Sequence, residues 1–292
     1  MTDLRTTTII AWRARPELRD TLQHNAPFLH ALGARVIVVN CGGDPAELRG
    51  LLSDDHRLHI TQIDLPDRPF NKSFALNVGI HEAPAGVVFV LDADILLTAS
   101  FASYADVCAT RDCFIVASGM TSIPPRAPIF TFPPGSFLRK VVLVSSHAYH
   151  WADGTVTDVL RQRIDCESSH RVAPGIILAR KDHLLDVGGY RSDLQGWGWE
   201  DLDIQIRLAH RGLECLYADE EIKHLDHGDE KRDLAGPKVD VEQANRARVW
   251  QSYCAGDLLG TYHADVRAWQ AARAAAPDEQ APRCQPASQG VA

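Results

Sequence analysis

The stretch VVFVLDAD, residues 87–94, says most about how this chain folds. Five apolar residues, Val87 to Leu91, are typical of a strand that is buried on both faces. Two carboxylates, Asp92 and Asp94, follow at its end, where burial is costly unless a positive partner joins them. A hard divalent cation that also binds a diphosphate would be such a partner. The alternative is a solvated turn, because D-x-D triplets are common.

Strand-like and helix-like segments alternate on both sides of this stretch. Helical spacing follows Pro16, and helices are also predicted over Asn71–Ala83 and Glu200–Leu213. Further strands are predicted at Thr7–Trp12, Val36–Val39, Leu58–Ile63 and Val172–Ala179. The alternation predicts an α/β fold, in which helices flank a mostly parallel sheet in a single domain. Ligands of such sheets bind beyond the carboxyl ends of the strands.

Composition and charge exclude several classes of protein. The chain has 292 residues with 30 Lys and Arg against 38 Asp and Glu, a net charge of −8. We therefore expect no nucleic-acid partner, because phosphate neutralisation needs a basic surface. No apolar run is long enough for a transmembrane segment or a signal peptide, so a cytoplasmic protein is expected. The seven cysteines form no C-x-x-C pair, which favours reduced thiols.

A histidine cluster, IKHLDHGD at residues 222–229, is a candidate metal site. His224 and His227 are three positions apart, with Asp226 and Asp229 beside them. Positions i and i+3 of a flat strand face opposite ways, so both histidines can bind one ion only if the chain turns here. An exposed polar loop is the alternative.

The segment GWGWEDLD, residues 196–203, combines two tryptophans with three acids at a helix start. An aromatic face suits the C–H surface of a sugar, and a carboxylate can bind or deprotonate a hydroxyl. The structural alternative is that the acids only stabilise the helix dipole. That alternative does not account for the two Gly-Trp pairs that precede the helix.

A basic turn, AWRAR at residues 11–15, follows the first predicted strand. Arg13 and Arg15 are suited to an anion or a base at the mouth of a cleft, and Lys72 is a candidate third cation. Ordinary surface positions are the alternative for each of these side chains.

These segments together resemble glycosyltransferases of the GT-A fold, most of all β-1,4-galactosyltransferases and chondroitin-polymerase-type enzymes. Residues 11–15 resemble that family's Pro-Phe-Arg-Asn-Arg segment, and FNKSFALNVG at 70–79 resembles its FNRAKLLNVG. Residues 88–94 are similar to its D-x-D strand, and residues 196–203 to its GWGGEDDD motif. His224 and His227 stand where the family has Met-x-x-His metal ligands. The likeness covers most of residues 7–95 and 172–232.

The resemblance implies a role for each of these side chains. Asp94, His224 and His227 would hold Mn²⁺, or Mg²⁺, and Asp201 and Glu200 would be the catalytic residues. The residues implied to bind the nucleotide-sugar are Arg13, Arg15, Phe70, Lys72, Asp92, Asp94, Gly175 and Trp197. His224 departs from the family pattern, because a Met is the usual ligand there.

The resemblance also implies a division of the chain. Residues 1–273 would be the GT-A domain, with a nucleotide-binding half at 1–100, an acceptor and catalytic half at 101–232, and a C-terminal helical segment at 233–273. Ala, Pro, Gln and Ser dominate residues 274–292, which are predicted to be a disordered tail. No role is predicted for residues 100–171.

The expected activity is transfer of a sugar from a nucleotide-sugar, a UDP-sugar above all, to a carbohydrate or other hydroxyl acceptor. Retaining N-acetylgalactosaminyltransferases of related sequence carry Asn where Asp201 stands, so an inverting enzyme is expected, with Asp201 as its base. The positive helix end is expected to keep Asp201 ionised. Two alternatives stay open: a metal-dependent hydrolase that uses His224, Asp226 and His227, and a non-catalytic carbohydrate-binding protein.

Overall fold

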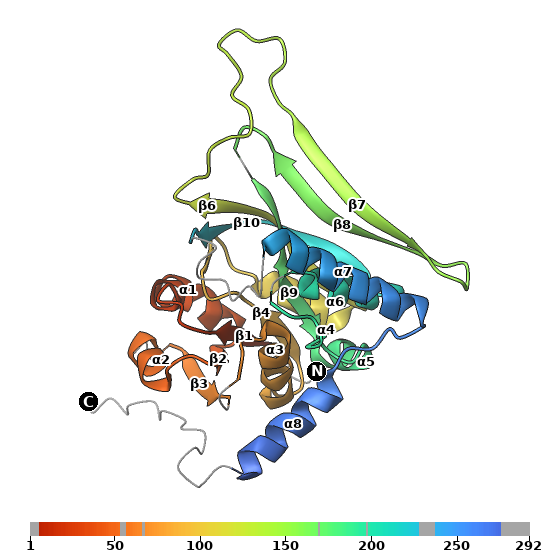
Figure 1. The fold of residues 1–292 in the computed structure, drawn as a ribbon. Helices are drawn as coiled ribbons and strands as arrows, with labels where there is room; N and C mark the ends of the chain where they lie inside the picture. The colour runs from red at the N-terminus through yellow and green to blue at the C-terminus, as the bar shows by residue number, and fades with distance from the viewer. Residues whose placement is uncertain are drawn as a thin grey trace, which may run out of the picture.

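The computed structural model describes residues 6–52, 57–65, 68–168, 170–196, 198–227 and 237–275, with the backbone alone at 174 and 219–221. A single large sheet runs through the molecule, and helices cover both of its faces (Figure 1). Along this sheet the strands follow the order β3-β2-β1-β4-β9-β6-β10-β5, and β7 and β8 extend it from β9. The α/β fold class predicted from the sequence is confirmed.

The N-terminal half of the sheet is parallel, as predicted. Its strands are β1 (Thr6–Trp12), β2 (Arg35–Asn40), β3 (His59–Asp64) and β4 (Val87–Val90). The helices between them are α1 (Leu18–Leu32), α2 (Pro45–Leu51) and α3 (Lys72–Glu82). Ile9 of β1 is level with Ile37 of β2 and Val90 of β4. The carboxyl ends of β1 and β4 therefore reach the same edge of the sheet.

The second half is mixed, which corrects the expectation of a mostly parallel sheet. Its strands are β5 (Ile95–Leu97), β6 (Cys113–Ile123), β7 (Val142–His150), β8 (Val156–Asp165), β9 (Arg171–Arg180) and β10 (Glu214–Leu225). β9 is antiparallel to β4, β6 and β8, while β6 and β10 are parallel. No helix lies between β6 and β9 in the described residues. Strands connected without crossover helices pair antiparallel.

Helices complete the molecule on both sides of the sheet. They are α4 (Ala102–Thr110), α5 (Lys181–Asp186), α6 (Glu200–His210), α7 (Lys238–Cys254) and α8 (Tyr262–Ala275). The core on one face packs α1 and α4 against the sheet, and the core on the other packs α3, α6 and α8. A third cluster, including Val159, Trp199 and Val249, joins β8, α6 and α7.

Two further predictions meet the structure here. α8 continues to Ala275, so residues 274 and 275 are helical and not part of a tail; the rest of the predicted tail lies outside the described residues. In the described part of the chain, the cysteines are free thiols. None of the helices described has the length and apolarity that crossing a membrane requires.

Candidate active site

A cleft of about 760 Å³ opens where β1 and β4 end, between the parallel half of the sheet and α6. Every predicted site residue that the structure describes lines this cleft: Arg13, Arg15, Phe70, Lys72, Asp92, Asp94, Gly175, Glu200, Asp201, His224 and His227. Trp197 lies outside the described residues. The cleft therefore brings together residues that are more than 200 positions apart in the sequence, from Arg13 to His227.

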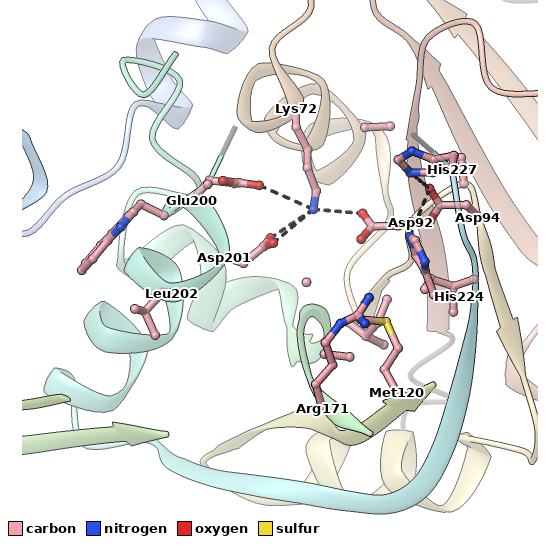
Figure 2. Close-up of a pocket in the computed structure, with 18 of the residues that line it drawn as sticks. Lys72, Asp92, Asp94, Met120, Arg171, Glu200, Asp201, Leu202, His224 and His227 are labelled. Carbon is pink, nitrogen blue, oxygen red and sulfur yellow. Dashed lines mark hydrogen bonds and ion pairs between the residues drawn. The ribbon is translucent and has the colours of Figure 1, made fainter. Parts of the chain in front are cut away.

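Asp94, His224 and His227 form one potential metal-binding group, whose ligand atoms all lie within 4.8 Å of one another. Asp94 Oδ2 is 3.1 Å from His227 Nε2 and 3.8 Å from His224 Nε2. β10 ends at Leu225, whose N–H donates to the Asp94 carbonyl oxygen, so the chain leaves the strand between the two histidines. The turn that both histidines need is thus present, and Figure 2 shows them facing Asp94.

This group fits a divalent cation. Ligand atoms bound to one ion at roughly 2.0–2.2 Å and at right angles lie about 3 Å apart, close to the Asp94–His227 separation. One carboxylate oxygen with two imidazole nitrogens is a donor set that suits Mn²⁺ and related ions. Burial lowers the pKa of His224, more than the Asp94 charge raises it, which favours the neutral ring. Burial raises the pKa of Asp94, but His227, His224 and Arg15 outweigh burial and hold it below its usual range.

Asp226 takes no part in the metal-binding group. Its Oδ1 accepts a hydrogen bond from Arg126 at 2.7 Å, and it is 3.7 Å from His224 Nδ1. Asp229, the other acid of the hydrolase hypothesis, lies outside the described residues.

Lys72 stands at the centre of a second cluster, among three carboxylates (Figure 2). Its Nζ is 2.9 Å from Asp92 Oδ1, 3.2 Å from Asp201 Oδ1 and 3.7 Å from Glu200 Oε1. Asn71 positions this lysine: its Oδ1 caps α3 by accepting the Phe74 N–H at 2.8 Å, which makes Lys72 the first helical residue. One ammonium group therefore joins the D-x-D turn to the first turn of α6.

The ionisation of this cluster differs from the expectation for Asp201. Burial raises the pKa of Asp201 to about 7, although the Lys72 charge acts in the opposite direction. Burial also opposes the charge on Lys72, but Asp201, Asp92 and Glu200 outweigh it and raise the pKa of Lys72 well above its usual value. The helix dipole alone therefore does not keep Asp201 fully ionised, because desolvation of a buried carboxylate is the larger effect.

Gly175 of β9 lies directly against the Lys72 cluster. A Cβ at this position would be 3.0 Å from Asp201 Oδ2, 3.0 Å from Asp92 Oδ2 and 3.3 Å from Lys72 Nζ. A side chain here would make these charged groups shift by a few tenths of an ångström, so glycine suits the close approach of the strand.

Hydrogen bonds from α7 stabilise the turn before α6. Trp199, the N-cap of α6, has a φ of 78° and is 6% exposed. The buried Asn245 of α7 donates to the carbonyl oxygens of Gln195 at 2.9 Å and Gly198 at 3.0 Å. Its Oδ1 accepts the Gln195 N–H at 3.2 Å. α7 thus supports an uncommon backbone conformation next to the two candidate catalytic acids.

The basic turn is also preorganised. Ala14 has a φ of 47°, and Trp12 Nε1 donates to the Arg15 carbonyl oxygen at 2.9 Å. Arg15 Nη1 is buried and has no hydrogen-bond partner among the residues that the structure describes. A buried cationic donor that is left unpaired is costly, and an anion in the cleft would satisfy it.

Sequence reasoning missed several residues that line the cleft: Met120, Arg126, Arg161, Arg171, Lys238 and Glu242. Arg161 of β8 and Glu242 of α7 form an ion pair, and Arg171 Nη1 donates to Ser122 Oγ at 3.4 Å. These residues belong either to residues 100–171, for which no role is predicted, or to α7. Two apolar runs indicate strands in that segment: CFIVA at the start of β6, and VVLV at residues 141–144.

Comparisons with known proteins bear on the fold of this chain and on residues 161–231. Residues 161–231 match a family model described as the N-terminal domain of galactosyltransferase. No curated protein matches the sequence. The crystal structure of GalNAc-T7 with UDP, GalNAc and Mn²⁺ superposes with a TM-score of 0.58 at 14% identity. That match covers 85% of this chain and 48% of GalNAc-T7, so the chain spans about half the length of that protein.

A second solved structure is similar over more of its own length. It is the mannosyltransferase PcManGT from Pyrobaculum calidifontis in complex with GDP-Man and Mn²⁺. Its TM-score is 0.50 at 14% identity, and the match covers 94% of this chain and 76% of that one. The chain therefore has the fold of the GT-A glycosyltransferases and resembles galactosyltransferases in residues 161–231.

Proposed function

We propose that this protein is a metal-dependent inverting glycosyltransferase that moves a sugar from a UDP-sugar to a hydroxyl group of a carbohydrate or similar acceptor. The observation that carries the proposal is the Lys72 cluster. It places the D-x-D turn and the α6 acids in one cleft, beside a three-ligand metal group. The solved structures of the same fold contain a nucleotide or nucleotide-sugar and Mn²⁺, which supports this choice of ligands.

The donor would occupy the side of the cleft formed by the N-terminal residues. Asp94, His224 and His227 would hold Mn²⁺ or Mg²⁺, which when bound neutralises charge on the diphosphate leaving group. Arg13 and Arg15 face the same region and would bind the nucleotide. Residues 1–100 would thus serve as the nucleotide-binding half and residues 101–232 as the acceptor and catalytic half.

The transfer step would depend on the α6 acids. Asp201 would accept the proton of the acceptor hydroxyl while its oxygen bonds to the anomeric carbon and the bond to the nucleoside diphosphate breaks. Glu200 would orient the acceptor through a hydrogen bond. Lys72, which Asp92 also contacts, would keep Asp201 in place and stabilise its ionised form. Trp197 is proposed to stack on the sugar.

The hydrolase alternative is not favoured, because Asp94 and not Asp226 completes the metal-binding group. A purely carbohydrate-binding protein would not account for a base candidate whose pKa is raised to about 7.

Binding tests the donor and the metal together. We expect UDP-sugars at 100 times their dissociation constant to stabilise the protein by about 2.7 kcal/mol with Mn²⁺ and not with EDTA. GDP- and dTDP-sugars are the comparison ligands. Asp94→Ala and His227→Ala should each abolish the Mn²⁺-dependent stabilisation, whereas the matched control Asp226→Ala should keep it. Equal stabilisation in EDTA would refute the metal assignment.

Catalysis is tested separately from binding. Asp201→Asn should lower the transfer rate about 10²- to 10⁴-fold and leave UDP-sugar affinity nearly unchanged. Anomeric configuration of the product, read by NMR, distinguishes inversion from retention. Transfer by Asp201→Asn within a few-fold of wild type would remove Asp201 from the role of base.

A further inference from the structure

The loop between β6 and β7, residues 124–141, exposes apolar side chains that the proposed reaction does not use. It rises away from the rest of the molecule at the top of Figure 1. Phe137 is fully exposed, and Ile129, Phe130 and Leu138 are 60%, 51% and 55% exposed. Leu143 and Val144, at the start of β7, are exposed as well. Single exposed apolar residues are ordinary, but several on one projecting loop mark an interaction site.

The stretch of chain that contains this loop carries a net positive charge, the opposite of the whole chain. From Cys113 to Ala152 the sequence contains no Asp or Glu, although the chain has 38 such residues and a net charge of −8. The same stretch contributes Arg126, Arg139 and Lys140. Two acids from other segments reach it: Asp226 pairs with Arg126 at 2.7 Å, and Asp165 with Lys140 at 2.9 Å.

A further cation lies at the base of the loop. Arg163 lines a small cavity of about 290 Å³ together with Lys140 and its partner Asp165. Arg139 and Arg163 are both exposed. The apolar surface is therefore bordered by positive charge even where two of its cations are paired with acids.

We propose that the β6–β7 loop docks the protein on an anionic lipid surface. Phenylalanine and leucine side chains would enter the boundary between headgroups and acyl chains, and the bordering cations would bind the anionic headgroups. Each Lys or Arg near such a surface adds to binding, and the effect is screened by salt. Arg126, in the same loop, lines the cleft, so a docked loop would place the mouth of the cleft beside the headgroups.

A second copy of the chain fits this surface less well. A symmetric interface would bring Arg139 and Lys140 of both copies together, and like charges oppose such contacts. The five prolines of the loop, at 124, 125, 128, 133 and 134, also remove backbone donors that strand addition would need.

The experiment is co-sedimentation of the full chain with vesicles, without any sugar donor. One set of vesicles is phosphatidylcholine alone, and the other mixes it equally with phosphatidylglycerol. We expect binding to the mixed vesicles only, weakened by high salt. Phe137→Ser combined with Leu138→Ser should reduce the affinity at least about tenfold, and Arg139→Gln should reduce it by a smaller factor.

The matched control is Val239→Ser on α7, which also removes an exposed apolar side chain, 61% exposed, but lies outside the loop. It should bind like wild type, and circular dichroism should show all variants folded. The proposal is overturned if the wild type does not bind the mixed vesicles or if the double variant binds equally well. It is also overturned if light scattering shows a dimer that the double variant converts to a monomer. None of these outcomes depends on glycosyl transfer.

Discussion

Asp201 has a raised pKa because it is buried, and Lys72 limits the rise. A base must be unprotonated, so kcat/KM of the wild type should increase with pH through about 7, the pKa of Asp201 in the free enzyme. Lys72→Met removes a charge that lowers this pKa, so the acidic limb of the kcat/KM profile should move to higher pH. Arg111→Met, which removes a surface cation paired with Glu214, is the control. An unchanged limb in Lys72→Met would contradict the coupling.

The close packing of Gly175 against the Lys72 cluster leads to a second prediction about a single residue. Gly175→Ala would place its Cβ 3.0 Å from carboxylate oxygens of Asp92 and Asp201, which must shift by a few tenths of an ångström. Because a full ångström of misplacement costs about 100-fold in rate, transfer should fall by about threefold to tenfold. Gly50→Ala is the matched control, since its Cβ meets no atom within 4 Å. It lies in α2, so it should keep full activity and add up to about 1 kcal/mol of stability.

Single residues could be predicted where chemistry and spacing coincide. The D-x-D stretch is recognisable because two acids follow an apolar strand. The histidine pair is recognisable because two imidazoles stand close to a glycine. The partners of Lys72 could not be found this way, because Asp201 is 129 positions further along the chain. The raised pKa of Asp201 could not be predicted from the sequence either. It results from burial, and burial of a residue at a helix start depends on which other segments pack against that helix.

At the scale of elements, α7 supports the turn before α6 through Asn245. Asn245→Ala would leave the carbonyl oxygens of Gln195 and Gly198 and one N–H without their partner. We expect a loss of about 1–3 kcal/mol in the free energy of unfolding, measured by urea titration. The transfer rate should fall as well, because the turn before α6 loosens. Gln251→Ala, at an exposed position of α7, should change neither quantity; an Asn245→Ala enzyme of wild-type activity would contradict the supporting role.

Elements were predictable from the sequence only in part. β1 to β4, α1, α3 and α6 follow apolar periodicity and clear helix starts, which depend on neighbouring residues alone. β7 and β8 do not, because they form a ribbon that projects from the body, where β7 exposes most of its side chains and β8 buries few. β9 was identified as a strand, yet its antiparallel direction depends on which strands it lies between.

Over the whole molecule, the cleft unites residues from 11 to 242. Local patterns and the resemblance together assigned its nucleotide side and its acids, since those lie at strand ends and at a helix start. The wall formed by β8 and α7 depends on long-range packing, such as the ion pair of Arg161 with Glu242. No local pattern in β8 or in α7 indicates that Arg161 and Glu242 pair with each other.

The central position of β9 also bears on the order in which a growing chain can assemble. β9 lies between β4 and β6, so residues 171–180 connect the two halves of the sheet. Until residues 171–180 have been synthesised, one edge of β4 has no neighbouring strand. This apolar edge can then pair with a wrong strand. Closure of the sheet waits for a contact between Val88 and Ala179, and such distant contacts form slowly. Chaperone demand during synthesis should therefore peak before β9 emerges and decline once it has inserted.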